Sequence, residues 1–569
     1  MTPFPISQRD VAPLLLRTLM DRGAFMQPNN LIVTKTSKGY LQLTYAEHQV
    51  KAKMLASALT KYGIKLGDRV ASLMWNCTNH LTCYQGVSCM GAILHTLNVR
   101  LGEKDLGRII EHAQDRIIIS DADVLPLLGS VDPAILNRVE LFICNGLDYE
   151  EGNYKLPASI PASKTTSWEK FLATGSPDFV WPEFPETTFH ALCYTSGTTG
   201  MPKGAAYSHR STYLHTLASG GIDSLGISGA DVVLPVVPMF HVLAWGVPFV
   251  TTMLGTRVVF NGRHTDPDSL LDCFVDWKVT FSNGVPTVWQ GVQGVIEKRG
   301  IDKVKAHLAL HTLTCGGSAP ASAMMKWYAD NLGVQMVQGW GMTETNPLAL
   351  VGRQTTKFKH IALSSEDKFK NCTKAGLSIP GLTFRIADPD DLDKDVPRGE
   401  SGELLVKGPW IISEYFQFDA PEKFHKGFLV TGDVAKYDEE GAVIITDRSK
   451  DVIKSGGEWI SSIDMENHIA AMDEIAGATV IGVPHPKWDE RPIAIVVPKT
   501  GADQENINAK VIEHCAKLFA KFQLPDDVLV WKELPLTSTG KLDKKAMREK
   551  LADAKYVLPT LRKEPKSKL

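Results

Sequence analysis

The sequence predicts an α/β protein with a large N-terminal domain of parallel-rich sheets layered with helices, a small β-barrel-like subdomain, and a small mobile α+β C-terminal domain. Before residue 190, amphipathic helical segments alternate with short apolar strands, which is typical of sheets covered by crossover helices. Short strands with frequent Gly and Pro follow at 376–445. A charged turn at 447–451 then precedes a segment of small-domain size.

Helix and strand periodicities place the first elements. An amphipathic helix is expected at 46–62, with apolar strands at 69–75 and 116–120. Further strand candidates, each followed by enough chain for a crossover helix, lie at 256–261, 279–283 and 334–338. The barrel-like unit has strand candidates at 402–406 and 442–445.

At 569 residues the chain is longer than one hydrophobic core usually organises. We expect an N-terminal domain at 1–446, a polar, exposed hinge at 447–451, a mobile C-terminal domain at 452–557 and an exposed tail at 558–569.

One apolar stretch, 232–254, is long enough to raise the question of a membrane span. Pro235, Pro238 and Pro248 each remove a helical hydrogen bond, and His241 would need a partner in lipid. A buried strand, turn and helix is therefore expected, with no transmembrane segment.

The amino-acid composition limits the kinds of molecule that the protein is expected to bind. Hydrophobic residues at 44%, charged residues at 22% and a net charge of -3 describe an ordinary globular protein without electrostatic affinity for nucleic acid. The nine cysteines show no CxxC spacing, which favours a reducing compartment over a zinc or disulfide framework. The first 20 residues lack the features of a secretion signal.

The last three residues, Ser567, Lys568 and Leu569, match the carboxy-terminal address of the peroxisomal matrix and follow a basic stretch. An import receptor would be their partner. The alternative is a chance tripeptide, which is expected about once in several thousand termini.

A loop rich in glycine and hydroxyl groups follows the strand candidate at 189–193. Main-chain N–H groups freed by glycine, hydroxyl donors and a mobile lysine are the groups that bind phosphates. Pro202 stands where a Walker A loop has glycine, so this is a different phosphate loop; a flexible surface turn is the alternative. Its candidate ATP-binding residues are Thr195, Ser196, Gly197, Thr198, Thr199, Gly200 and Lys203.

Five further motifs stand after this loop, at 339–344 (GWGMTE), 431–433 (TGD), 447–451 (DRSKD), 454–458 (KSGGE) and 539–541 (TGK). In this order and spacing the chain resembles the adenylate-forming superfamily, which contains acyl-CoA synthetases, peptide-synthetase adenylation domains and beetle luciferases. The resemblance covers nearly the whole chain and implies ATP, Mg²⁺ and, for the synthetases, coenzyme A.

The resemblance assigns the first half-reaction to a few side chains. Thr343 would touch the α-phosphate, Glu344 would hold Mg²⁺, and Lys541 would stabilise the charge that develops between carboxylate and α-phosphate. Taken alone, Lys541 would be a solvated lysine in a polar loop.

Further residues would contact the nucleotide. By the same resemblance, Trp340 lies against adenine, Asp433 accepts from the ribose hydroxyls and Arg448 reaches the ribose. Gly317 and Gly341 complete the expected ATP site. Taken alone, Trp340 would be a core residue and Asp433 a turn residue.

The second half-reaction would use the C-terminal domain. Lys450 matches the hinge of the acyl-CoA synthetases, about which that domain swings to bring a glycine-rich segment to the thiol arm of coenzyme A. The matching residues are Lys454, Ser455, Gly456, Gly457, Glu458 and Trp459.

The segment at 239–246 resembles the acyl-site motif of medium- and long-chain acyl-CoA synthetases. His241 would lie near the reacting carboxylate, and Val242 and Trp245 would wall the acyl tunnel, with Gly317 and Gly341 at its floor. The alternative for so apolar a segment is plain core packing.

The sequence therefore predicts an AMP-forming acid-thiol ligase that activates a carboxylic acid, with a medium- or long-chain fatty acid expected first. Two alternatives stay open: a ligase for a specialised biosynthetic acid and a luciferase-like oxygenase that oxidises the adenylate. The presence of Lys541, Glu344 and the segment 454–458 argues against a module that only adenylates or only binds nucleotide. A homodimer is left open as well.

Overall fold

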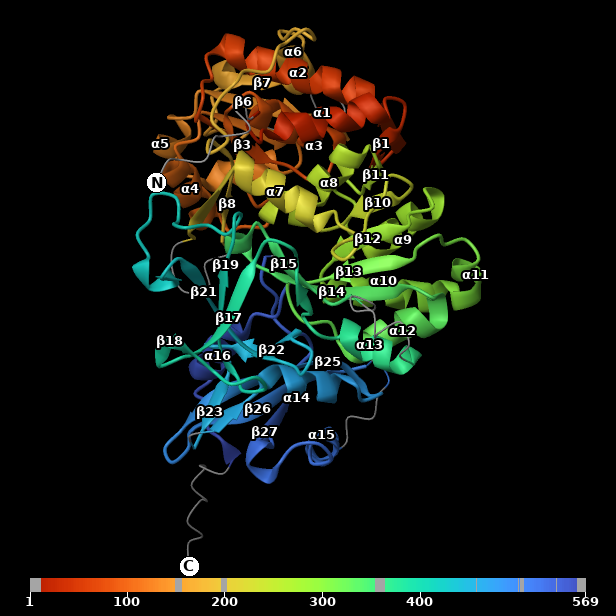
Figure 1. Cartoon of the computed structure of the whole chain (residues 1–569), viewed down its shortest axis with the longest axis vertical. Coiled ribbons are helices and arrows are strands. Elements are labelled where there is room, and N and C mark those ends of the chain that lie inside the picture. Colours follow the sequence, from red (N-terminus) through yellow and green to blue (C-terminus); the bar gives the residue numbers. More distant parts are fainter. Residues whose placement is uncertain are drawn as a thin grey trace, which may run out of the picture.

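The computed structural model describes residues 12–148, 156–195, 202–353, 364–456, 458–499, 501, 506–538 and 540–559. Figure 1 shows the α/β architecture that the sequence predicts. Two sheets layered with helices form the upper part, a smaller sheet lies below them, and the C-terminal segment, in blue, forms the base.

The first sheet is parallel except at one edge, where β8 and β9 form a hairpin. Its order is β7 (Thr165–Ser167), β6 (Leu141–Asn145), β5 (Ile117–Asp121), β3 (Arg69–Leu73), β4 (Ile93–Thr96), β8 (Phe189–Tyr194) and β9 (Gly204–Ser208). The apolar strands predicted at 69–75, 116–120 and 189–193 are β3, β5 and β8.

The second sheet is parallel in its centre and antiparallel at both ends. Its order is β16 (Leu377–Ser378), β15 (Leu348–Val351), β14 (Gln335–Gly341), β13 (Thr312–Cys315), β12 (Phe281–Gly284), β10 (Val232–Pro235), β11 (Arg257–Phe260), β1 (Leu31–Thr36) and β2 (Gly39–Thr44). The strand candidates at 256–261, 279–283 and 334–338 correspond to β11, β12 and β14.

Helices fill the space between the two sheets and cover their outer faces. One core unites both sheets with α1 (Leu16–Met26), α2 (Tyr45–Tyr62), α3 (Thr78–Cys89) and α8 (Val247–Leu254), and every residue of α3 is buried. The outer face of the first sheet carries α4 (Glu103–Ala113), and that of the second carries α9 (Pro267–Asp276), α10 (Pro286–Arg299) and α12 (Ser322–Leu332).

The N-terminal region and the barrel-like unit contain further helical elements. They are α5 (Pro133–Leu136), α6 (Trp168–Leu172), α7 (His209–Ser219), α11 (Ile301–Lys305), α13 (Ser365–Cys372) and the 3-10 turns η1 (Leu125–Ser130), η2 (Ala162–Lys164), η3 (Val242–Gly246), η4 (Thr343–Thr345) and η6 (Pro421–Lys423).

Capping residues in the sequence fix both ends of helix α2. The Thr44 side chain accepts from the main-chain N–H of Glu47, whose carboxylate accepts from the Thr44 N–H, so a capping box begins the helix. Gly63 ends it with φ of 104°, in the left-handed region that favours glycine. Capping at both ends fixes the helix at almost the range that periodicity predicts.

The apolar stretch at 232–254 folds as the sequence predicts, into strand β10, a turn and helix α8. Val242, Leu243, Ala244 and Trp245 of the turn all have φ between 44° and 59°. Left-handed backbone costs about 1–2 kcal/mol per non-glycine residue, so the surrounding packing holds this turn in place. In the described parts of the chain, no helix is both long and apolar enough to cross a membrane.

A smaller antiparallel sheet forms the barrel-like unit. It consists of β18 (Asp391–Asp395), β17 (Thr383–Asp388), β19 (Gly402–Lys407), β21 (Phe428–Tyr437), β20 (Phe424–His425) and β22 (Val443–Arg448). Strand β22 runs through Arg448, so the first two residues of the expected hinge belong to the sheet.

The C-terminal segment packs helices on both faces of a five-stranded sheet. Its strands are β24 (Glu458–Ile460), β23 (Ile453–Ser455), β26 (Asp489–Pro498), β25 (Ile475–His485) and β27 (Asp527–Val530). One core contains α14 (Ser462–Ala470) and α15 (Ile507–Cys515), and another contains α16 (Lys544–Asp553). The short turn η7 (Lys521–Gln523) precedes β27.

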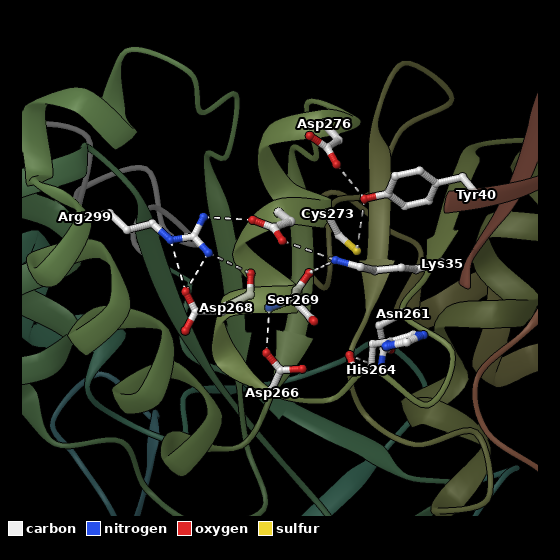
Figure 2. Close-up of polar contacts among 11 residues, drawn as sticks. Lys35, Tyr40, Asn261, His264, Asp266, Asp268, Ser269, Cys273, Asp276 and Arg299 are labelled. Atoms are coloured by element: carbon white, nitrogen blue, oxygen red, sulfur yellow. Dashed lines mark hydrogen bonds and ion pairs between the residues drawn. The ribbon is translucent and has the colours of Figure 1, made fainter. Parts of the chain in front are cut away.

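Polar contacts tie the β1–β2 hairpin to α9, and α9 to α10 (Figure 2). Lys35 donates to the Ser269 carbonyl at 3.1 Å, and the Tyr40 hydroxyl donates to Asp276 at 2.7 Å. Arg299 pairs with Asp268 at 2.6 Å. Helix α9 therefore holds the β1–β2 hairpin, whose strand β2 forms one edge of the second sheet.

Candidate active site

The phosphate loop leaves the first sheet at the end of β8, where parallel strands present their carboxyl ends. Thr195 and Lys203 close its base: the Thr195 N–H donates to the Lys203 carbonyl at 2.9 Å, and the Lys203 N–H donates to the Thr195 hydroxyl at 3.1 Å. The expected ATP ligands inside the loop lie outside the described residues: Ser196, Gly197, Thr198, Thr199 and Gly200.

The Lys203 ammonium group lies over two aromatic rings. Its Nζ is 5.0 Å from the ring centre of Tyr415 and 4.8 Å from that of Phe418, within the range of cation–π attraction. The exposed Glu422 carboxylate is 3.7 Å away. A positive charge therefore stands at the base of the loop, where phosphates would approach.

Thr343 and Glu344 form a turn after β14. The Tyr207 hydroxyl donates to the Thr343 carbonyl at 2.7 Å and fixes the main chain. The Tyr415 hydroxyl donates to Glu344 Oε1 at 2.6 Å, and Glu344 is only 7% exposed. This carboxylate is thus held near the phosphate loop.

Trp340, Asp433 and Arg448 meet at the junction of β14, β21 and β22. Trp340 Nε1 donates to Asp433 Oδ2 at 2.9 Å, and Arg448 Nε is 3.3 Å from Asp433 Oδ1. The Asp433 carboxylate raises the pKa of Arg448. The structure therefore brings together the three residues that the sequence analysis assigns to adenine and ribose.

Lys541 reaches this cluster from the C-terminal domain. A Cβ placed on Gly317 would lie 3.0 Å from Lys541 Cε, so the bare glycine, with φ of 82°, leaves room for the side chain. Burial and the nearby Arg448 lower the pKa of Lys541 to about 8, while Asp433 and Glu344 act in the opposite direction. Lys541 is therefore not the solvated lysine of the alternative interpretation.

Hydrogen bonds across the domains hold the Lys541 loop. Thr287 Oγ1 donates to the Gly540 carbonyl at 3.2 Å, and Asn98 Nδ2 donates to Ser538 Oγ at 3.2 Å. Nearby, Gln290 donates to the Ala476 carbonyl at 2.7 Å. These contacts seat the C-terminal domain with Lys541 inside the site.

His241 lies beside Lys541 at the start of the left-handed turn. Burial, with the nearby Lys541 charge, lowers the pKa of His241 to about 3, so the imidazole is neutral at physiological pH. Val242 is 3% exposed and belongs to the core between the sheets. The Trp245 ring lies against Gly316, where an added Cβ would be 3.1 Å from its Cη2. An aromatic wall therefore adjoins the Lys541 position.

Gly341 is a glycine for a reason of packing. A Cβ there would lie 1.9 Å from the Pro347 carbonyl oxygen, a distance that no side chain could occupy. The turn that carries Thr343 and Glu344 therefore depends on close approach of two main-chain segments.

The hinge segment is less exposed than the sequence predicts. Lys450 is exposed, but Asp447 is 1% exposed, so the prediction of an exposed turn is wrong at this residue. Its carboxylate accepts from the main-chain N–H of Ser462 at 2.7 Å and caps α14. Asp447 lies before Lys450 and Ser462 lies after it, so this hydrogen bond crosses the expected hinge. Burial raises the pKa of Asp447 to about 6.

The described residues of the glycine-rich segment form the β23–β24 hairpin. Ser455 accepts from Arg491 at 3.0 Å, and Gly456 has φ of 64° with its N–H bonded to the Trp488 carbonyl at 2.9 Å. Lys454, Glu458 and Trp459 are exposed, and Gly457 lies outside the described residues. Among the parts described, no hydrogen bond links this hairpin to the N-terminal domain.

Sequence reasoning missed several residues of the site, namely Tyr207, Tyr415, Glu403, Asn98 and Thr287. Glu403 is 8% exposed; it accepts from the Gly432 N–H at 2.6 Å and from the Ser449 hydroxyl at 2.8 Å. Glu403 could have been identified from the sequence, because a carboxylate at the start of an otherwise apolar strand is unusual. The tyrosines gave no such signal, because buried aromatic residues are ordinary in strands and loops.

Comparison with known proteins shows which family the chain matches. The family model described as AMP-binding enzyme matches residues 20–416, and that of the AMP-binding enzyme C-terminal domain matches residues 464–541. The chain is 39% identical over 550 residues to a 3-methylmercaptopropionyl-CoA ligase of Ruegeria lacuscaerulensis, covering 96% of this chain and 99% of the relative.

A second relative is the long-chain-fatty-acid–CoA ligase of Thermus thermophilus, 38% identical over 96% of this chain and 97% of its own. Among solved structures, an anthranilate CoA ligase in complex with anthranoyl-AMP superimposes with a TM-score of 0.82 at 22% identity, covering 95% of this chain and 99% of that one. That likeness concerns the fold.

Proposed function

The chain belongs to the AMP-binding enzyme family and is an AMP-forming acyl-CoA ligase that uses ATP, Mg²⁺ and coenzyme A; from that premise we propose that its acid is a medium- or long-chain fatty acid. The observation that carries the proposed mechanism is the position of Lys541. Its ammonium group comes from the C-terminal domain and lies beside Gly317, His241 and the Asp433 cluster.

In the first half-reaction we propose that Lys541 and its neighbours stabilise the negative charge of the reacting groups. A carboxylate oxygen of the acid attacks the α-phosphorus of ATP, and the bond to the bridging oxygen of pyrophosphate breaks. Lys541 stabilises the charge between carboxylate and α-phosphate, and neutral His241 can donate to the carboxylate without repelling Lys541. Trp340, Asp433 and Arg448 hold the nucleoside.

Glu344 suits Mg²⁺ because it offers a buried, anionic oxygen near the phosphate loop. Among the described residues, no three His, Cys, Asp or Glu side chains gather as a ligand set. The protein would thus supply one carboxylate, with phosphate oxygens and water as the other ligands, as is usual for this ion. Bound Mg²⁺ would neutralise phosphate charge and orient the leaving pyrophosphate.

In the second half-reaction we propose that the C-terminal domain turns about Lys450, withdrawing Lys541 and bringing the β23–β24 hairpin to the adenylate. The thiol sulfur of coenzyme A attacks the acyl carbon, AMP leaves with the bonding electron pair, and the thioester forms. The thiol proton passes to solvent. The few polar contacts that seat Lys541 are compatible with such an alternation.

The apolar wall near Lys541 supports a fatty acid as the proposed substrate. Val242 and Trp245 are apolar, and the described neighbours of the turn belong to a hydrophobic core, which suits an uncharged alkyl tail. A short thioether acid is the second candidate, because a relative with 39% identity is named for 3-methylmercaptopropionate.

A panel of acids tests this proposal. AMP release is measured with and without coenzyme A for octanoate, palmitate, 3-methylmercaptopropionate and cinnamate. We expect the highest kcat/KM with a fatty acid, and coenzyme A should be required for turnover. Preference for 3-methylmercaptopropionate would select the second candidate, whereas light emission or oxygen uptake would select luciferase-like chemistry.

The depressed pKa of Lys541 predicts a pH dependence. Only the charged ammonium stabilises the developing negative charge, so adenylation should be full well below pH 8, be halved near pH 8 and approach a fall of about tenfold per pH unit above it. The measurement is pyrophosphate release between pH 6.5 and 9.5. In Lys541→Arg, whose guanidinium stays charged, the fall should disappear; a fall of equal size in that variant would assign it to another group.

We also propose import into the peroxisomal matrix through Ser567, Lys568 and Leu569, which lie outside the described residues. The tripeptide and a trans-cinnamate:CoA ligase of Petunia hybrida, 28% identical and named as peroxisomal, support this proposal, whereas the relatives described above come from the bacteria Ruegeria and Thermus. A fluorescent protein carrying residues 558–569 should enter peroxisomes of a eukaryotic cell, and deletion of the tripeptide should leave it in the cytosol.

A further inference from the structure

We propose that Tyr415 is a positioning residue that orients the Glu344 carboxylate for Mg²⁺ and couples it to Lys203 of the phosphate loop. The proposal rests on the proposed function, in which Glu344 holds the metal ion of MgATP. It concerns a tyrosine that none of the recognised sequence motifs contains.

The first support is the hydrogen bond between the two side chains. The Tyr415 hydroxyl donates to Glu344 Oε1 at 2.6 Å, and the residues are 4% and 7% exposed. A buried hydrogen bond to an ionised carboxylate is short and strong, so it fixes the orientation of the acceptor. Tyr415 is the side-chain donor to this carboxylate among the described residues, which leaves Oε2 for a metal ion.

Main-chain bonds on both sides of Tyr415 fix its position. The Ile412 N–H donates to the Glu344 carbonyl at 3.0 Å, and the Phe416 N–H donates to the Gly204 carbonyl at 2.8 Å. Gly204 begins the strand that follows the phosphate loop. The segment around Tyr415 therefore links the Glu344 turn to the end of this loop at a fixed spacing.

The ring of Tyr415 makes the second contact with charge. Lys203 Nζ lies 5.0 Å from the ring centre, while the hydroxyl of the same ring bonds Glu344. One side chain thus touches the cation and the anion that would engage the ATP phosphates.

The alternative is that Tyr415 only fills space. Its ring packs against Phe418 and Phe424, so removal of the whole side chain would disturb the loop in either case. Tyr415→Phe separates the two roles, because it keeps the ring and the cation–π contact and removes only the donor. Outer-shell partners of metal ligands typically contribute 10–100-fold to metal affinity.

The test is a Mg²⁺ titration of Tyr415→Phe. We expect the half-saturating Mg²⁺ concentration for pyrophosphate release to rise about tenfold. The increase in melting temperature produced by MgATP should shrink, and Mn²⁺ bound to the enzyme with ATP, measured by electron paramagnetic resonance, should weaken similarly. Thioester formation from a supplied acyl adenylate should stay at the wild-type rate.

Tyr328→Phe is the matched control. The Tyr328 hydroxyl is also buried and donates one hydrogen bond, at 2.7 Å to the Trp289 carbonyl, and both residues belong to the core on the outer face of the second sheet. It should lose comparable stability without any change in the Mg²⁺ titration. In a Glu344→Gln background, Tyr415→Phe should produce no further change in Mg²⁺ dependence, because the two residues act as a unit.

An unchanged Mg²⁺ titration and an unchanged MgATP-induced stabilisation in Tyr415→Phe would overturn the proposal, as would an equal further loss in the Glu344→Gln background. Failure of the proposed function would look different, because the wild-type enzyme would then release no AMP with any acid of the panel.

Discussion

Lys541→Ala is expected to slow adenylate formation by about 10²–10³-fold, the usual loss when one preorganised charge-stabilising group is removed. The structure places this ammonium group next to Gly317 and His241 and within the field of Asp433 and Glu344. In water, a lysine would have to be oriented during the reaction, whereas here the cross-domain contacts have already placed it.

The two half-reactions should respond differently. Thioester formation from a supplied acyl adenylate and coenzyme A should stay near the wild-type rate, because in the proposed mechanism Lys541 leaves the site before that step. Pyrophosphate exchange measures the first step, and thioester appearance measures the second. Lys545→Ala, an exposed lysine on α16 paired with Glu549, serves as the control. Equal loss of both steps would contradict the two-arrangement mechanism.

Glu344→Gln should also reduce adenylate formation by about 10²–10³-fold, since the amide keeps the shape of the carboxylate and removes its charge. The Tyr415 hydroxyl can still donate to the amide oxygen, so the turn should keep its structure. The expected signature is a large increase in the Mg²⁺ required for pyrophosphate release, with little change in unfolding temperature.

This variant has a second signature. The Glu344 charge raises the pKa of Lys541, so its removal should move the alkaline fall of adenylation to lower pH. Glu297→Gln, on the exposed end of α10, is the control for loss of a carboxylate. If Glu344→Gln kept both the wild-type Mg²⁺ response and the wild-type pH profile, the metal ion would have to be held elsewhere.

Local signals account for what could be predicted from the sequence. The apolar run of β8 and the capped helix α2 follow from periodicity and capping chemistry, which depend on residues close in the chain. The apolar segment at 232–254 was predicted to be a buried strand, turn and helix because its prolines exclude one long helix. Its left-handed turn could not be foreseen, since packing and not residue type imposes positive φ there.

Contacts over long sequence separations account for the rest. Tyr415 and Glu344 are 71 positions apart, and Asn98 and Ser538 are 440 apart. No periodicity or motif links such residues, because folding alone brings them together. Asp447 was expected to be exposed, since charged residues in a polar run normally are. It is buried instead, because its carboxylate accepts from the Ser462 N–H in the first turn of α14, where the helix supplies no acceptor of its own.

The bonds that seat the Lys541 loop have an evolutionary consequence. Thr287 and Gln290, both on α10, bind carbonyl oxygens of Gly540 and Ala476, and every residue type supplies such an acceptor. At these two points the N-terminal domain binds main-chain atoms of the C-terminal domain and not its side chains. A C-terminal domain transplanted from a relative would therefore offer α10 the same two acceptors, whatever side chain follows Glu474 and Ile475 at position 476.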